Sequence, residues 1–162
     1  RSTQGYSSAA SDVYKRQSWD ILITIACAFA ISKAMVNSGV ADAVARFIIG
    51  MSYHYGPHVL LAAVFIITNL FTELITNNAA AALAFPLALS ISSQMGVSPM
   101  PFFVVICMAA SASFSTPIGY QTNLIVQGIG NYKFTDFVRI GLPLNIITFL
   151  ISIFLIPLIW PF

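Results

Sequence analysis

Fifty-nine consecutive residues of this chain, from Leu74 to Tyr132, include no Asp, Glu, Lys or Arg, and the same is true from Ile140 to Phe162. A soluble domain is roughly 25% charged, whereas this chain is 7% charged and 58% hydrophobic. Uncharged runs of this length cannot cover a water-facing surface, so a soluble domain and a disordered chain are both excluded. A nucleic-acid-binding protein is excluded as well, because it needs a basic stripe. The sequence therefore predicts an all-α polytopic membrane protein.

The first 17 residues differ in character from everything that follows. They are polar and Ser-rich and lack the apolar core of a signal peptide. The stretch SDVYKRQ resembles a translated sequencing adapter, so we expect 1–17 to be non-native or disordered, with coding sequence missing upstream. A short cytoplasmic lead-in is the alternative. These residues carry the whole net charge of +2, since the later charges cancel, and the basic pI therefore says nothing about an anionic substrate.

Apolar runs and breaks divide 18–162 into five segments. In chain order they are a span at 18–36, an amphipathic segment at 39–55, two apolar arms within 59–95, an interrupted apolar segment at 102–131 and a last span at 141–162. Asp42 and Arg46 share one face of the second segment, which is typical of a helix lying in the membrane interface. The two arms are each near spanning length, so they form either a hairpin joined at membrane depth or two ordinary spans joined by an exposed loop.

Two polar breaks interrupt the apolar segments and carry the chemistry of the chain. They are TNN at 76–78 and STPIGYQTN at 115–123, the second opened by Pro117 and Gly119. We expect Asn78 and the pair Thr122-Asn123 to cap the helices that follow. A helix N-terminus presents unpaired N–H groups and about half a positive charge, so two such ends at membrane depth would hold an anion without a basic side chain. The hydroxyl, amide and carbonyl oxygens suit a small hard cation such as sodium.

Two stretches, TELITNNAAAALAFP at 72–86 and TPIGYQTNLIVQGIGNYKFTDFVRIGLPLN at 116–145, resemble the C-terminal half of a divalent anion:sodium symporter of the DASS, or citrate-transporter-like, family within the ion transporter superfamily. Members of that family contain two inverted repeats, and an elevator-like movement carries substrate and sodium bound between them. The resemblance implies that this chain is one inverted repeat of an elevator-type transporter. It further implies that 59–95 is a re-entrant helical hairpin and 102–131 a discontinuous transmembrane helix.

The resemblance also implies which residues bind ligands. The implied substrate-binding residues are Thr76, Asn77, Asn78, Tyr120, Gln121, Thr122 and Asn123, and the implied sodium-binding residues are Thr72, Asn77 and Gly119. Tyr120 and Gln121 replace a Thr-Pro pair that contacts carboxylate in dicarboxylate carriers. The substrate expected from this departure is sulfate or a similar oxyanion of the sulfate-type branch, rather than a dicarboxylate. Sodium is then the coupling ion, and no other cofactor or metal is expected.

Other polar residues leave alternatives open. Glu73 is the one acid deep in an apolar arm, and it is either functional or a structural group satisfied by nearby asparagines. Ser111, Ser113 and Ser115 either line a cavity or bond back to helical carbonyls. If Glu73 titrates during transport, the protein is instead a proton-coupled antiporter or an oxyanion exporter. A non-transporting membrane subunit is a remote alternative, and an enzyme is not expected because no catalytic motif is present.

The charged residues near the end of the chain suggest an orientation. If Lys133 and Arg139 face the cytoplasm, the last span runs outward, so the C-terminus lies outside the inner membrane. The site of a two-repeat carrier lies between its repeats, so the expected partners are the missing N-terminal repeat of the same protein and, in the complete protein, a second copy. The expected ligands are a small inorganic or carboxylate anion and sodium, with the lipid bilayer as surroundings and no nucleic acid.

Overall fold

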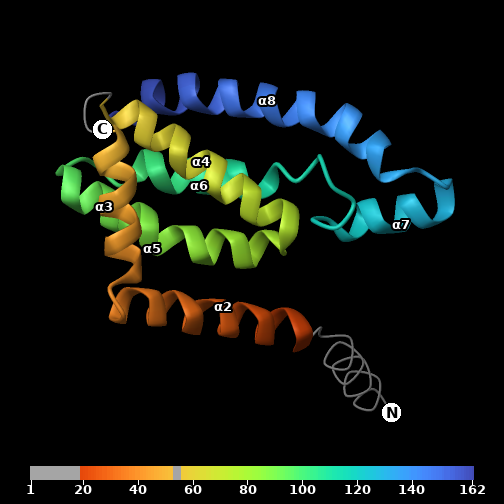
Figure 1. Ribbon diagram of the computed structural model, residues 1–162, viewed down its shortest axis with the longest axis horizontal. Helices are drawn as coiled ribbons and strands as arrows, with labels where there is room; N and C mark the ends of the chain where they lie inside the picture. Colours follow the sequence, from red (N-terminus) through yellow and green to blue (C-terminus); the bar gives the residue numbers. More distant parts are fainter. Residues whose placement is uncertain (1–18, 53–55) are drawn as a thin grey trace, which may run out of the picture.

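The computed structural model of the chain describes residues 19–52 and 56–162. All regular elements in these residues are helices, which confirms the all-α prediction. The helices are α2 (Trp19–Asn37), α3 (Val40–Ser52), α4 (Pro57–Leu74), α5 (Asn77–Met95), α6 (Met100–Ser111), α7 (Gln121–Gly130) and α8 (Phe134–Ile159), as Figure 1 shows. The lead-in at 1–17, the first residue of the expected span and the last residues of the amphipathic segment, 53–55, lie outside the described residues.

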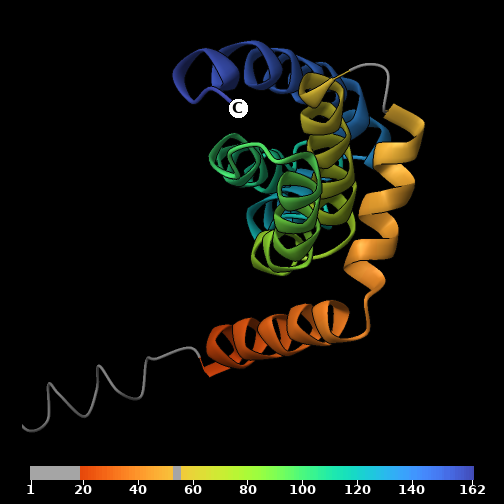
Figure 2. The ribbon, with the colours of Figure 1, turned by 90° about the vertical axis from the view of Figure 1, so that its left-hand side faces the viewer.

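Helices α4, α5 and α6 form the centre of the molecule. Their buried side chains share one core, whose largest members include Phe65, Phe102 and Ile91. Helix α8 packs on α4 and α6, and α2 lies against α5. Helix α3 crosses one end of this group at a steep angle to α4 and α5 (Figures 1 and 2), so its direction differs from that of the central helices, as expected for a helix in the membrane interface.

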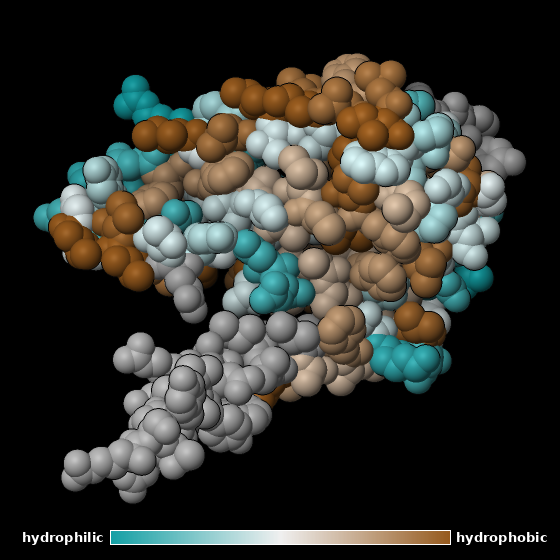
Figure 3. Space-filling model, turned by 180° about the vertical axis from the view of Figure 1, so that it is seen from behind, coloured by the Kyte–Doolittle hydropathy of each residue, from teal (hydrophilic) through white to brown (hydrophobic). Residues whose placement is uncertain are grey.

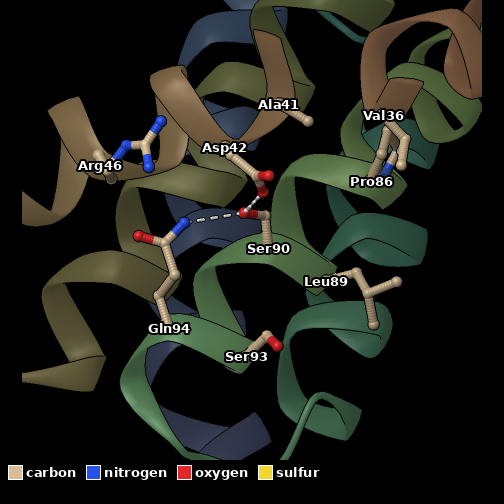
Figure 4. A pocket seen from close by; sticks show the side chains of 9 residues that line it. All are labelled: Val36, Ala41, Asp42, Arg46, Pro86, Leu89, Ser90, Ser93 and Gln94. Atoms are coloured by element: carbon tan, nitrogen blue, oxygen red, sulfur yellow. Dashed lines mark hydrogen bonds between the residues drawn. The ribbon is translucent and has the colours of Figure 1, made fainter. Parts of the chain in front are cut away.

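A polar contact fixes α3 to the central helices. The Ser90 hydroxyl of α5 donates a hydrogen bond to the Asp42 carboxylate of α3, and Gln94 Nε2 donates to Ser90 Oγ at 2.9 Å (Figure 4). Arg46 lines the same open pocket of about 400 Å³. The charged face predicted for this segment is therefore turned partly toward α5, while Val44 and Phe47 are exposed.

Local sequence explains where the α4–α5 hairpin begins, turns and ends. Pro57 is the first residue of α4, where its missing N–H has no helical partner to lose. The chain leaves α4 after Leu74 and enters α5 at Asn77, with Thr76 in an extended conformation between them. Gly96 ends α5 at a φ of 66°, and the N–H of the next residue bonds back to Ser92 O at 3.1 Å. The two arms are thus antiparallel neighbours joined by a two-residue connection.

The outer surface of the molecule is strongly apolar. Two of the described helices, α4 and α8, are long and apolar enough to cross a membrane. Most apolar side chains of α8 are exposed, and they form a brown band along the top of Figure 3. In water such a surface would aggregate, so it faces lipid or further protein.

The second break divides the apolar segment after α5 into α6 and α7. Helix α6 ends at Ser111, residues 112–120 are non-helical, and α7 begins at Gln121. Helix α7 continues along the long axis away from the hairpin, and its backbone stays apart from all other described helices (Figure 1). The joint of the hairpin and the break therefore both lie near the middle of the molecule's length.

Candidate functional site

The joint of the hairpin and the break at 112–120 touch each other at Gly119. A methyl group added to Gly119 would collide with Ser113 Oγ and lie 2.5 Å from the backbone oxygen of Thr72, so Gly119 is pressed against the end of α4. Gly119 is buried, and so are Thr72 and Ser113. Only a residue without a side chain fits this contact. The structure thereby brings together Thr72 and Gly119, two of the three implied sodium-binding residues.

Side-chain hydroxyls and amides satisfy the last carbonyl groups of α4 and α6. A helix ends with carbonyls that have no partner in the helix, and these two ends meet beside the break. The hydrogen bonds run from Thr72 Oγ1 to Ala110 O (2.7 Å), from Asn69 Nδ2 to Ala112 O (2.6 Å), from Ser113 Oγ to Thr72 O (3.1 Å) and from Thr116 Oγ1 to Glu73 O (2.8 Å). The break is therefore an ordered structure, in which the side chains of Ser113 and Thr116 each make a defined hydrogen bond.

Asn77, the third implied sodium-binding residue, lies directly beside Thr72. The Thr72 hydroxyl oxygen is 2.8 Å from Asn77 Oδ1 as well as 2.7 Å from Ala110 O. A hydroxyl has one hydrogen, so it can donate to only one of these two acceptors. The other contact is favourable only if the Asn77 amide is turned to donate to Thr72, or if a positive ion lies between the two oxygens.

The residues that follow the break are used in two different ways. Asn123 Nδ2 lies 3.4 Å from Ser113 O and 3.3 Å from Thr116 O, so its amide joins the start of α7 to two backbone carbonyls of the break. Tyr120 and Thr122 are exposed, while the side chain of Gln121 lies outside the described part of the chain. The structure thus places Asn123 in the site as a structural group and leaves Tyr120 and Thr122 on the surface beside it.

The expected helix caps are wrong by two or three residues. Thr76, not Asn78, caps α5, because its extended backbone lets Oγ1 accept from Ala79 N at 3.4 Å. Asn78 is the second residue of the helix and is exposed. Helix α7 begins at Gln121, and no side chain caps it, because the N-cap position is occupied by Tyr120. Asn123 lies inside the first turn, where its Nδ2 donates to carbonyls of the break. No hydrogen bond within the described residues joins the exposed Thr76 and Asn78 to Tyr120 or Thr122.

Glu73 holds the break against α8. Glu73 is 8% exposed, and its Oε1 accepts hydrogen bonds from the backbone N–H of Ser115 at 2.9 Å and from Asn145 Nδ2 at 2.8 Å. Asn145 Nδ2 also donates to Ser115 Oγ at 2.8 Å. An asparagine thus satisfies part of the carboxylate, as one alternative proposed, but it comes from α8 and is 72 positions away in sequence.

Sequence reasoning did not select Asn145 or Asn69 as site residues. Both are amides within otherwise apolar helices, and a polar residue at such a position is a functional or structural signal in a membrane protein. Of the three serines before the break, Ser113 and Ser115 bond within the site and Ser111 is exposed.

Four helix ends of two kinds meet at this site. The carbonyl ends of α4 and α6 carry partial negative charge, and the N–H ends of α5 and α7 carry partial positive charge. The N–H groups of the first turn of a helix have no helical partner. An arrangement of this kind can hold a small cation on the carbonyl side and an anion on the N–H side.

Comparison with known proteins identifies the family of the chain. A model of the citrate transporter family, CitMHS, matches residues 6–161. An uncharacterized transporter of Synechocystis is 39% identical over 92% of this chain and 24% of its own length. Sodium/sulfate cotransporter 1 of Chlamydomonas reinhardtii is 36% identical over 91% of this chain and 17% of its own length. The sodium-dependent dicarboxylate transporter SdcS of Staphylococcus saprophyticus is 26% identical over 93% of this chain and 29% of its own length.

These relatives are named as transporters and not as enzymes. The chain spans at most about a quarter of the length of the Synechocystis and Chlamydomonas relatives. The match to the family covers nearly the whole chain, including both breaks and Asn145. The all-helical fold, the apolar surface and the polar breaks at the ends of four helices all agree with it. The chain belongs to the citrate transporter family and is a membrane protein.

Proposed function

We propose that this chain belongs to the C-terminal half of a sodium-coupled transporter that takes up a divalent anion, with sulfate or a similar oxyanion as substrate in preference to a dicarboxylate. The observation that carries the proposal is the contact of the hairpin joint with the helix break, which gathers Thr72, Asn77 and Gly119 in one place. The Chlamydomonas relative named a sodium/sulfate cotransporter is 36% identical to the chain, against 26% for the dicarboxylate transporter, which favours sulfate.

In this proposal sodium binds beside the end of α4. The Thr72 hydroxyl and the Asn77 side-chain oxygen lie 2.8 Å apart, and the hydroxyl hydrogen points to Ala110 O when it makes the shorter contact. Two oxygens that face each other without a hydrogen between them repel, and a sodium ion beside them removes the repulsion. The backbone of Gly119 approaches the same point because it has no side chain.

The anion binds to helix ends and not to basic side chains. No Lys or Arg occurs between Leu74 and Tyr132, so the attraction comes from the N–H groups at the starts of α5 and α7 and from the sodium ion. Thr76, Asn78, Tyr120 and Thr122 are exposed beside these ends, and with Gln121 they would contact the substrate. Their exposure supports a site that is completed by protein outside this chain, as in a carrier with two inverted repeats.

The length of α8 supports a re-entrant hairpin. Helix α8 has 26 residues, which corresponds to about 39 Å. The end of α4 contacts it at Asn145, the twelfth of these residues. A hairpin that turns back halfway along such a helix does not cross the whole membrane. We therefore retain the re-entrant hairpin at 59–95, the discontinuous helix at 102–131 and an elevator-type movement as parts of the proposal. An inner-membrane location, an outward C-terminus and a homodimer also remain parts of it.

Uptake of radioactive sulfate into proteoliposomes containing the complete transporter tests the proposal. We expect uptake to require an inward sodium gradient, to be inhibited by unlabelled sulfate more strongly than by succinate, and to fall at least tenfold in the Asn77→Ala variant. Asn37→Ala, at the exposed end of α2, is the matched control and should transport normally. Uptake that needs no sodium, or normal uptake by Asn77→Ala, would contradict the proposal.

A further inference from the structure

Half of the Glu73 carboxylate is buried without a partner. Oε1 accepts two hydrogen bonds, but Oε2 is inaccessible to solvent and has no hydrogen-bond partner among the residues that the structure describes. Both donors to Oε1, the Ser115 N–H and the Asn145 amide, are neutral. A buried carboxylate without an opposite charge is strongly unfavourable, so either a cation or a proton must neutralise it.

Asn145 has a second orphaned oxygen in the same place. Its Nδ2 donates to both Glu73 Oε1 and Ser115 Oγ, while its Oδ1 is buried and has no partner. Turning the amide over would point Oδ1 at the carboxylate, and two acceptors would then face each other. The observed orientation is therefore the favourable one, and it leaves two acceptor oxygens free on two groups joined by a single hydrogen bond.

We propose that Glu73 Oε2 and Asn145 Oδ1 bind a sodium ion at a second cation site, separate from the one formed by Thr72, Asn77 and Gly119. This inference rests on the proposed function, in which sodium is the coupling ion. A cation satisfies both acceptors at once and also balances the charge of the carboxylate, which a neutral donor cannot do. Ser115 Oγ, which accepts from Asn145, has a lone pair left for the same ion.

The chemistry of the site selects a monovalent ion. It has a single carboxylate, and the described residues contain no group of three or more His, Cys, Asp or Glu side chains that could hold a metal ion. One carboxylate with neutral oxygens around it balances a charge of +1, and the combined site is then neutral in its low-dielectric surroundings. Oxygen ligands without sulfur or nitrogen match a hard cation.

Occupancy of this site would join three parts of the fold. Glu73 is at the end of α4, Ser115 is in the break and Asn145 is in the middle of α8. An ion held by all three would fix the hairpin joint and the break against α8. The site therefore provides a means by which sodium orders the chain before the anion binds.

Equilibrium binding of radioactive sodium to the purified complete transporter tests the site without measuring transport. We expect Glu73→Gln to lose one bound sodium per protomer, Asn77→Ala to lose one as well, and the double variant to lose two. Ser152→Ala is the matched control, because Ser152 is buried in α8 and its hydroxyl has no partner to lose. It should bind as many sodium ions as the unmodified protein.

A second variant and a parallel assay separate the possible failures. Asn145→Ala, which removes one ligand and keeps the carboxylate, should weaken sodium binding at one site at least tenfold. This variant replaces Glu73→Gln as the test if elution in size-exclusion chromatography shows that Glu73→Gln does not fold. An unchanged sodium count in folded Glu73→Gln, or an unchanged isotherm in Asn145→Ala, overturns the second site. That result includes the case in which a proton neutralises Glu73. Sulfate uptake that is independent of sodium overturns the proposed function instead.

Discussion

Replacing Gly119 with alanine tests whether the contact between the hairpin joint and the break forms the site. The new methyl carbon would lie 2.5 Å from Thr72 O, where ordinary contact begins near 3.4 Å. The end of α4 and the break would have to separate by roughly 1 Å, because the atom in the way is backbone and cannot rotate aside. Overpacking of this kind costs about 1–3 kcal/mol of folding free energy.

Two matched variants isolate the cause. Gly128→Ala adds the same methyl group on α7, where nothing lies within 4 Å, and should stabilise the helix by up to about 1 kcal/mol. The methyl at Gly119 would also collide with Ser113 Oγ. Ser113→Ala combined with Gly119→Ala removes that collision but leaves the one with Thr72 O, so the double variant should recover only in part.

Thermal unfolding of the purified protein and its sodium affinity together give the result. We expect Gly119→Ala to lower Tm, by roughly 2–4 °C per kcal/mol for a chain of this size, and to weaken sodium binding at least tenfold, while Gly128→Ala keeps normal affinity. The reasoning is refuted if Gly119→Ala and Gly128→Ala behave alike. It is also refuted if Ser113→Ala restores Gly119→Ala completely, since the collision with the α4 backbone would then be absent.

Three further substitutions test other contacts. Thr72→Val removes a hydroxyl bonded across to α6 and should destabilise by about 1–3 kcal/mol, whereas Thr68→Val, one turn earlier, removes a hydroxyl bonded within its own helix and should change Tm little; equal shifts would contradict the assigned roles. Gly141→Ala would collide with the backbone of the break, so it should lower both Tm and sulfate uptake, and an unchanged Tm would exclude the close packing of α8. Asp42→Ala removes the exposed hydrogen bond from Ser90 and should reduce the free energy of unfolding by less than about 1 kcal/mol, so that Tm falls only slightly and uptake stays normal. Loss of uptake would instead give α3 a role in transport.

The presence of the two breaks could be predicted because it depends on local chemistry, but the structure places them at 75–76 and 112–120, one to three residues before the predicted 76–78 and 115–123. Polar residues inside apolar runs, together with Pro117 and Gly119, interrupt a membrane helix wherever they occur. The residues that cap the new helices could not be chosen in the same way. Thr76 and Asn78 are both good caps, and only the backbone conformation at Thr76 decides between them.

The hydrogen-bond partners of the polar residues depend on tertiary structure and could not be predicted from the sequence. The sequence marked Glu73 as unusual, but its contact with Asn145 exists only because α8 packs beside the end of α4. Asn69 likewise bonds to Ala112 on α6, 43 positions away. The sequence alone can identify amides in apolar helices as candidate functional or structural residues. Identifying the groups that these amides bond to requires knowledge of how the helices pack.

Under the proposed function, the separation of charge at this site would let a chain without basic residues near its breaks attract an anion. The carbonyl ends of α4 and α6 and the Glu73 carboxylate carry negative charge, which a bound sodium ion would neutralise. The N–H ends of α5 and α7 then act on the anion without opposition from the carboxylate. Empty cation sites would leave the anion beside a net negative charge, so bound sodium would strengthen anion binding. Under the proposed function, the absence of charged residues from Leu74 to Tyr132 makes anion binding depend on the ion, and a lysine at either break would remove that dependence.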